Sequence, residues 1–240
     1  MVWAKGLWTN GITQFPEACE NLAIKVAGGR VGMRVMVTSE KSHAQISADR
    51  IARKGWTNVI VNVGDATNIS SWRLVAPGGL DRHMKFTPFA DSSVDSAISL
   101  DACYHFNTRQ KFLKLCASKL KTGGLLSLSD IILGSAKLSA LDRIFLRIFV
   151  IGTGVPMVNL VRLSEYEDDI KTAGFVNVEI EDVTDNVFGG LASFIRDRDT
   201  EFRHLLNWRR WLQYRVMRHF LEWVIAKGVL RFVVTKASYE

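Results

Sequence analysis

The middle of the chain alternates strand-like and helix-like segments, and this alternation constrains the fold more than any other feature. Apolar runs at 58–63, 94–100 and 125–133 are rich in Val, Ile and Leu, which is typical of strands. A helix is predicted between the last two runs, where Phe112 and Cys116 lie four residues apart on one apolar face. Strands that alternate with helices favour an α/β fold with a mostly parallel sheet and helices on both faces.

The same reasoning extends to both ends of the chain. Asn107, with Gln110 three residues on, predicts the start of the central helix. Residues 68–84 are expected to be irregular, with a turn at 77–79. Six strands are predicted in all. The further strands are expected at 34–39, 176–183 and 229–236, and further helices at 16–27, 40–54, 138–150, 164–174 and 201–226.

Charge is distributed unevenly along the 240 residues, a length that suffices for one domain with a substantial core. The net charge is +7, and +5 of it falls between 196 and 231, where there are nine Lys and Arg and four acids. A local basic surface attracts an anionic substrate, a membrane face or nucleic acid, although a solvated helix face gives the same pattern. No nucleic-acid reader motif accompanies the charge, so we expect no nucleic-acid partner.

The three cysteines, Cys19, Cys103 and Cys116, form neither a CxxC motif nor a Cys/His metal set. A sparse, odd cysteine count is typical of a reducing compartment, and the N-terminus has no apolar stretch of signal length. We therefore expect a cytoplasmic protein without a metal site. The longest apolar region, 138–161, carries three charged residues and is broken by Gly and Pro, which argues against a membrane span.

Acidic residues follow several of the predicted strands. Glu40, Asp65 and Asp101 stand just after a strand, and Asp130 stands near the end of another. Open α/β sheets bind ligands beyond the carboxyl ends of their strands. A carboxylate there accepts hydrogen bonds from ribose hydroxyls or an amino group. Each acid alone is weak evidence, because Asp after a strand is commonly a turn residue.

The order of these segments resembles the later two-thirds of a class I S-adenosylmethionine (SAM) methyltransferase. The likeness covers about residues 34–185 and is closest to the small-molecule branch, which includes tocopherol, cyclopropane-fatty-acid and macrolide methyltransferases. It is carried by Gly64-Asp65-Ala66 (the family's GDA turn), Phe89 to Asp95 (the entry to a strand), Leu120 to Gly124 (the "LKPGG" turn, with Thr for Pro), Ser164-Glu165-Tyr166, Ala173-Gly174-Phe175 and Glu181 to Asp185.

This resemblance implies a single Rossmann-like domain over 1–240 with a helical cap. Its expected parts are an N-terminal helical segment (1–30), a core (31–185), cap helices (186–228) and a last strand (229–240). The implied reaction is methyl transfer from SAM to an O, N or C atom of a small-molecule metabolite. The oligomeric state is left open.

The resemblance also assigns roles to individual residues. His105 is the candidate base, because histidine titrates in the required range; a histidine that flanks a helix and bonds to backbone explains it equally well. Tyr104 is expected to line the acceptor pocket, with ordinary core as its alternative. The expected SAM contacts are Gly64, Asp65 and Ala66 for adenine, Glu40 for ribose, and Leu100, Asp101 and Ala102 for the methionine part through backbone.

One part of the family's pattern is missing from the sequence. The first strand of the family ends in a Gly-rich loop, yet here residues 32–35 look like the start of that strand and 36–40 like the end of the second. The nearby glycines, within 28–32, precede the strand instead of following it, so they do not form the usual nucleotide turn. A non-catalytic protein that has lost SAM binding is therefore the alternative function.

A second alternative concerns the segment 202–224, where Trp208, Trp211 and Trp223 stand among arginines. Such a helix can lie on a membrane surface, which would make this a peripheral membrane contact. A lid over the acceptor pocket is the simpler explanation of the same residues.

Overall fold

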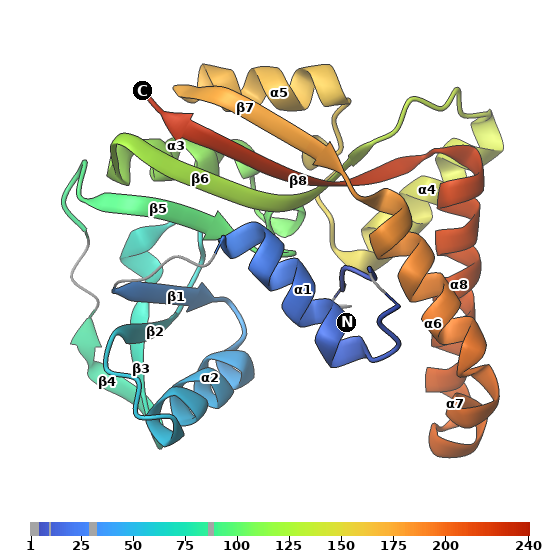
Figure 1. The fold of residues 1–240 in the computed structure, drawn as a ribbon, viewed down its shortest axis with the longest axis horizontal. Coiled ribbons are helices and arrows are strands. Elements are labelled where there is room, and N and C mark those ends of the chain that lie inside the picture. Colours follow the sequence, from blue (N-terminus) through green and yellow to red (C-terminus); the bar gives the residue numbers. More distant parts are fainter. Residues whose placement is uncertain (1–4, 10, 29–32, 86–88) are drawn as a thin grey trace.

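The computed structural model describes residues 5–9, 11–28, 33–85 and 89–240, and its strands form two four-stranded sheets (Figure 1). The first sheet has the order β1-β2-β3-β4 and the second the order β5-β6-β8-β7. The strands are β1 (Arg34–Thr38), β2 (Val59–Val63), β3 (Arg73–Ala76), β4 (Gly79–Lys85), β5 (Val94–Ser99), β6 (Leu120–Leu133), β7 (Phe175–Asp182) and β8 (Leu230–Tyr239).

Both sheets are mixed, so the prediction of about six strands in a mostly parallel sheet is not confirmed. Only β1–β2 and β5–β6 pair in parallel within the described residues. The region 68–84, expected to be irregular, contains the hairpin β3–β4, which turns at Gly78 with φ 84°. The last strand, β8, runs antiparallel between β6 and β7.

β1, the strand at which the sequence departs from the family's pattern, lies at an edge of its sheet. β1 is the terminal strand of the first sheet and β5 is the terminal strand of the second, and no ladder joins them in the described part of the chain. In Figure 1 the arrowheads of β1 and β5 nevertheless point the same way, toward α1. Within the described residues, the segment 34–38 forms one strand whose partner is β2.

Eight α-helices are described, and most lie where periodicity predicted them. They are α1 (Phe15–Ala27), α2 (Lys41–Arg53), α3 (Arg109–Lys119), α4 (Ala140–Thr153), α5 (Leu163–Thr172), α6 (Gly190–Asp197), α7 (Asp199–Leu205) and α8 (Trp208–Lys227). The predicted helix 201–226 is divided, because Asn207 is extended and accepts a hydrogen bond from the Arg210 amide (3.0 Å) as the cap of α8. Thr108, rather than Asn107, caps α3 through the Lys111 amide.

A buried ion pair joins α3 to β6, near the carboxyl end of that strand. Arg109 Nε lies 2.7 Å from Asp130 Oδ2, and the side chains are only 1% and 0% exposed. Arg109 Nη2 also donates to Asp130 Oδ1 and to the Ile131 carbonyl, both at 3.2 Å. Burial alone would lower the pKa of Arg109, but the Asp130 charge outweighs it and raises that pKa, so the guanidinium stays charged. Asp130, expected at a strand end, is therefore a core residue.

Replacing Arg109 with Met should cost about 3–5 kcal/mol of unfolding free energy, because it leaves the Asp130 carboxylate buried and unpaired. Urea denaturation followed by circular dichroism measures the loss. The double variant Arg109→Met/Asp130→Leu should recover part of it. Arg210→Met, at an exposed position on α8, is the control and should change stability by no more than about 0.5 kcal/mol. A loss below about 1 kcal/mol for Arg109→Met would contradict the assigned role of the pair.

Candidate functional site

The turn after β5 carries most of the predicted site residues. Asp101 has a positive φ of 51°, and its amide donates to Ser129 Oγ on β6 at 2.7 Å. The chain then forms one 3₁₀ turn, η2 (Cys103–His105). The positive φ reverses the chain at the carboxyl end of a parallel strand, where α/β folds place their ligands.

Asn159 holds this turn in place from 50 residues or more along the chain. Its side chain is buried, and its amide nitrogen donates to the carbonyls of Tyr104 (3.0 Å) and Phe106 (2.6 Å). Its oxygen accepts from the amide of Arg109 at 3.0 Å. Three backbone groups around His105 are thereby fixed by one side chain.

Lys5, Asp101 and Tyr104 form a polar cluster beside the turn. Lys5 Nζ lies 3.2 Å from Asp101 Oδ1 and 2.7 Å from the Tyr104 hydroxyl. The hydroxyl donates to Asp101 Oδ1 at 2.5 Å. Burial, reinforced by the Asp101 charge, raises the pKa of Tyr104 well above its ordinary value, so the phenol stays protonated. The Asp101 carboxylate is thus bound within the protein, and its backbone also has partners, Ser129 Oγ for the amide and the Tyr104 hydroxyl for the carbonyl (3.1 Å). The SAM contact expected at Asp101 stays a prediction.

His105 is half-buried and hydrogen-bonds to the end of α4. Its Nδ1 lies 3.4 Å from the carbonyl oxygen of Gly154, and its ring centroid is 4.4 Å from that of Tyr104. Burial lowers the pKa of His105, although the Gly154 hydrogen bond partly offsets the effect. A neutral imidazole that donates from Nδ1 to a carbonyl keeps a lone pair on Nε2. This is the protonation state that a general base requires.

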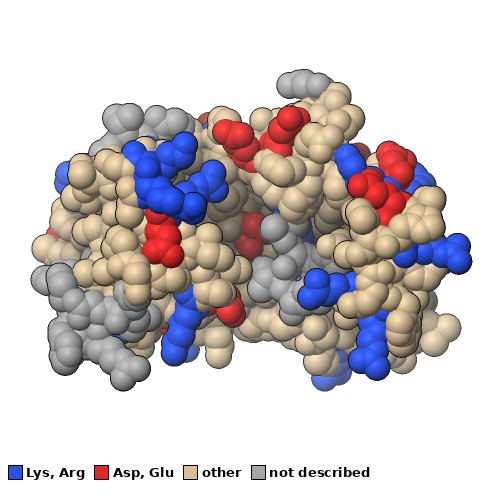
Figure 2. Space-filling view, turned by 90° about the horizontal axis from the view of Figure 1, so that it is seen from below, with Lys and Arg blue, Asp and Glu red and all other residues tan. Residues whose placement is uncertain are grey.

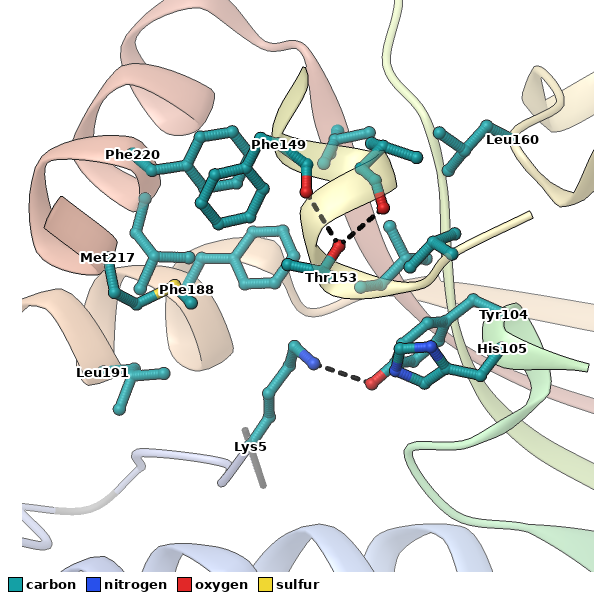
Figure 3. A pocket seen from close by; sticks show the side chains of 15 residues that line it. Lys5, Tyr104, His105, Phe149, Thr153, Leu160, Phe188, Leu191, Met217 and Phe220 are labelled. Carbon is teal, nitrogen blue, oxygen red and sulfur yellow. Dashed lines mark hydrogen bonds between the residues drawn. The ribbon is translucent and has the colours of Figure 1, made fainter. Parts of the chain in front are cut away.

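Tyr104 and His105 open onto an apolar cavity of about 70 Å³, which exceeds the room needed for a single water (Figure 3). The wall comes from α4 and the segment that follows it, from the predicted cap segment 186–228, and from β6 and β8. The lining residues are Lys5, Tyr104, His105, Ile131, Phe149, Val150, Thr153, Val155, Leu160, Phe188, Leu191, Met217, Phe220, Leu221 and Leu230. The hydroxyl of Thr153 donates to its own helix, at the Phe149 and Val150 carbonyls. The cavity therefore suits an apolar group beside one imidazole and one ammonium.

The predicted adenine and ribose residues lie elsewhere, at the ends of β1 and β2. Among the residues that line the cavity, only Tyr104 and His105 belong to the predicted site. Asp65 is exposed, and its Oδ1 accepts from the amide and the hydroxyl of Thr67, both at 2.8 Å. Trp72 Nε1 donates to the Asp65 carbonyl at 2.8 Å and closes the turn. Glu40 is also exposed, and its amide donates to Thr38 Oγ1.

Sequence reasoning missed Lys5, Arg109 and Asn159, which connect the site to the rest of the chain. Lys5 lies in a segment that was expected only to be helical, and its partner Asp101 is 96 residues away. Asn159 follows a Pro in an irregular stretch, so no periodic pattern marked it. No group of three or more His, Cys, Asp or Glu among the described residues is arranged to hold a metal ion.

Comparison with known proteins agrees with the resemblance seen in the sequence. A family model described as a methyltransferase domain matches residues 80–128, which include β5, the turn with His105, α3 and the start of β6. The erythromycin 3''-O-methyltransferase of Saccharopolyspora erythraea is 33% identical over an alignment of 109 residues, and the alignment covers 42% of this chain and 34% of that enzyme.

Solved structures share the fold across nearly the whole chain. Phosphoethanolamine N-methyltransferase 2 of Haemonchus contortus, in complex with SAM, superimposes with a TM-score of 0.66 at 17% identity, covering 92% of this chain and 52% of that one. The cyclopropane synthase MmaA2 of Mycobacterium tuberculosis gives a TM-score of 0.64 at 14% identity, covering 98% and 89%. The resemblance to class I SAM methyltransferases is thus confirmed in sequence and in fold. The chain spans about half of the Haemonchus enzyme, and its match spans about a third of the macrolide enzyme.

Replacing Asn159 with Ala should lower the unfolding free energy by about 2–4 kcal/mol, because three backbone groups lose their partner. It should also shift the imidazole NMR signals of His105, because the turn is released. Asn186→Ala is the control, since this exposed side chain makes one hydrogen bond, to the Trp8 carbonyl. Unchanged stability with unchanged His105 signals would show that Asn159 does not position the turn.

Proposed function

We propose that this protein transfers a methyl group from SAM to an O, N or C atom of a small, largely apolar molecule. The observation that carries the proposal is the turn 100–106: it lies within the region that matches the methyltransferase-domain model, and it presents His105 to an apolar cavity. The macrolide relative acts on a small molecule according to its name, which supports the acceptor class. The fold alone would not fix the reaction.

The residues at the ends of β1, β2 and β5 fit a SAM molecule in their donor and acceptor chemistry. Both hydrogen bonds from Thr67 go to Oδ1 of Asp65, so Oδ2 of this exposed carboxylate suits the adenine amino group. Glu40 is proposed for the ribose hydroxyls, with Gly64 and Ala66 beside the base. Seen from below, the surface is hollowed between the end that holds α2 and the end that holds α7 and α8 (Figure 2).

SAM supplies an electrophilic methyl group, so the protein has to align the two reactants and manage one proton. His105, neutral and with Nε2 unprotonated, is proposed to take the proton of an acceptor hydroxyl or ammonium. The apolar wall holds the acceptor and excludes water from it, while Tyr104 borders the same space. We assign α6, α7 and α8, which lie within 186–228, to the cap and residues 31–185 to the core of one domain, the division that the sequence predicted.

Calorimetric titration with SAM tests the proposal directly. We expect a micromolar dissociation constant, which corresponds to about 8 kcal/mol. Asp65→Ala should weaken binding about 10–100-fold, because it removes a hydrogen bond to a charged group. The control is Asp95→Ala, whose exposed carboxylate pairs with Lys121. No binding by the folded wild-type protein would favour the alternative, a methyltransferase fold that has lost its donor site.

Replacing His105 with Asn should reduce kcat/KM for methyl transfer by about 10²–10⁴-fold while SAM affinity is retained. In the wild type the lowered pKa of His105 keeps the imidazole neutral at physiological pH. The rate should therefore rise with pH only below about 6.5, the ordinary value for histidine, and be flat above it. The Asn variant should lack this acidic limb. An identical limb in both proteins would assign it to another group.

A further inference from the structure

Helix α4 is apolar on both its inner and its outer side. On the inner side, Leu146 and Val150 are buried, and Phe149 and Val150 line the cavity. An extended apolar helix face is ordinarily covered by protein or by lipid. Its outer side is nevertheless open to solvent, with exposed fractions of 77% for Leu141, 57% for Ile144, 45% for Phe145, 65% for Ile148 and 63% for Ile151.

These outer residues form one continuous stripe, which we call the α4 stripe (Leu141, Ile144, Phe145, Ile148 and Ile151). Leu141, Ile144, Ile148 and Ile151 follow one another at intervals of three and four residues, which places them along one face. Phe145 joins the stripe to α8, because its ring meets that of Trp223 edge-on with centroids 4.9 Å apart. α4 and α8 lie together at the right of Figure 1.

Two arginines border the α4 stripe. Arg143 and Arg147 are exposed one helical turn apart, and neither forms an ion pair within the described residues. The acid of this helix, Asp142, is bound at the helix N-terminus, where it accepts from Ser139. The outer face of α4 therefore combines a bare apolar stripe with uncompensated positive charge.

The basic residues of α7 and α8 are arranged differently. Arg215 lies 3.9 Å from Asp199, and Arg218 lies 3.7 Å from Glu222. Arg209 stacks over Trp208, with 5.5 Å from the guanidinium carbon to the ring centroid. Several arginines of the segment 202–224, considered above for a membrane contact, thus form ion pairs or cation–π contacts within the protein. Arg143 and Arg147 of α4 form no ion pair among the described residues.

We propose that the α4 stripe docks on the surface of an anionic lipid bilayer, with the helix lying in the plane of the interface. The apolar side chains enter the acyl boundary, and Arg143 and Arg147 reach back to the lipid phosphates. Among the described residues, no helix is long and apolar enough to cross a membrane, so the contact is a peripheral one. A second copy of the chain fits less well, because a two-fold contact through the same face would bring four arginines together. The docking does not depend on methyl transfer.

Co-sedimentation with lipid vesicles tests the docking with the intact chain. Vesicles of phosphatidylcholine with 30% phosphatidylserine, about the charge of an anionic leaflet, are compared with pure phosphatidylcholine at low and high salt. The wild type should bind the anionic vesicles, and the double variant Ile144→Asp/Ile148→Asp should lose binding at least about tenfold. Arg143→Gln and Arg147→Gln should each weaken it about fivefold. Leu205→Asp, at an exposed apolar position on α7 (71%), is the matched control and should bind as the wild type does.

Each alternative outcome overturns the proposal. Equal binding by the wild type and the Ile144→Asp/Ile148→Asp variant, both shown by circular dichroism to be folded, would place the contact elsewhere. Loss of binding only with Leu205→Asp would place it on α7. Light scattering that shows a dimer dissociated by Ile144→Asp/Ile148→Asp, with no vesicle binding, would make the stripe an interface between two copies. Each readout is independent of SAM and of catalytic activity.

Discussion

The second sheet and the turn that carries His105 depend on one charged contact in the core, between Arg109 and Asp130. Two charges with almost no exposure are stable only because each satisfies the other and the remaining donors reach carbonyls. Further groups complete the network: the guanidinium lies over the ring of Tyr166 at 4.9 Å, and the Tyr166 hydroxyl meets Thr235 Oγ1 on β8 at 3.1 Å. These contacts fix the orientation of helix α3 and its distance from the sheet. Because Asn159 binds the Arg109 amide, the same network fixes the position of the turn that carries His105.

Local patterns in the sequence predicted the individual elements well. The strand expected at 94–100 is β5 at 94–99, and the helix expected at 16–27 is α1 at 15–27. The pairing of the strands was harder to predict, because an apolar run shows the same sequence pattern whichever strand it pairs with. The strands β3 and β4 were not predicted at all: residues 68–84 were expected to be irregular, and their Pro-Gly turn indicated only that the chain reverses.

The candidate site was predicted in part, for a physical reason. The turn after β5 was recognisable because acidic, aromatic and imidazole groups follow a strand directly. What holds that turn was not recognisable, because Lys5 and Asn159 reach it across 96 and 55 residues. Likewise the cavity wall mixes residues from helices far apart in the sequence, none of which differs from ordinary core in its own segment. A local pattern carries no information about which distant core residues will face an empty volume.

Because the two sheets are separate, one of them can unfold locally while the other stays folded. Their cores are unequal: the first sheet buries a small cluster of Ala44, Ala48, Val61, Val63 and Val75, whereas the second is flanked by two extensive clusters. Because no ladder joins β1 to β5 among the residues that the structure describes, the first sheet can lose its hydrogen bonds as a separate cooperative unit while the second keeps its own. Amide hydrogens of β1 and β2 would then exchange with solvent at a lower free-energy cost than those of β6 and β8. A ligand bound at the turn after β2 would slow that exchange, because it binds only while the first sheet is folded. Its measured affinity would therefore be lowered by the free energy needed to keep the first sheet folded.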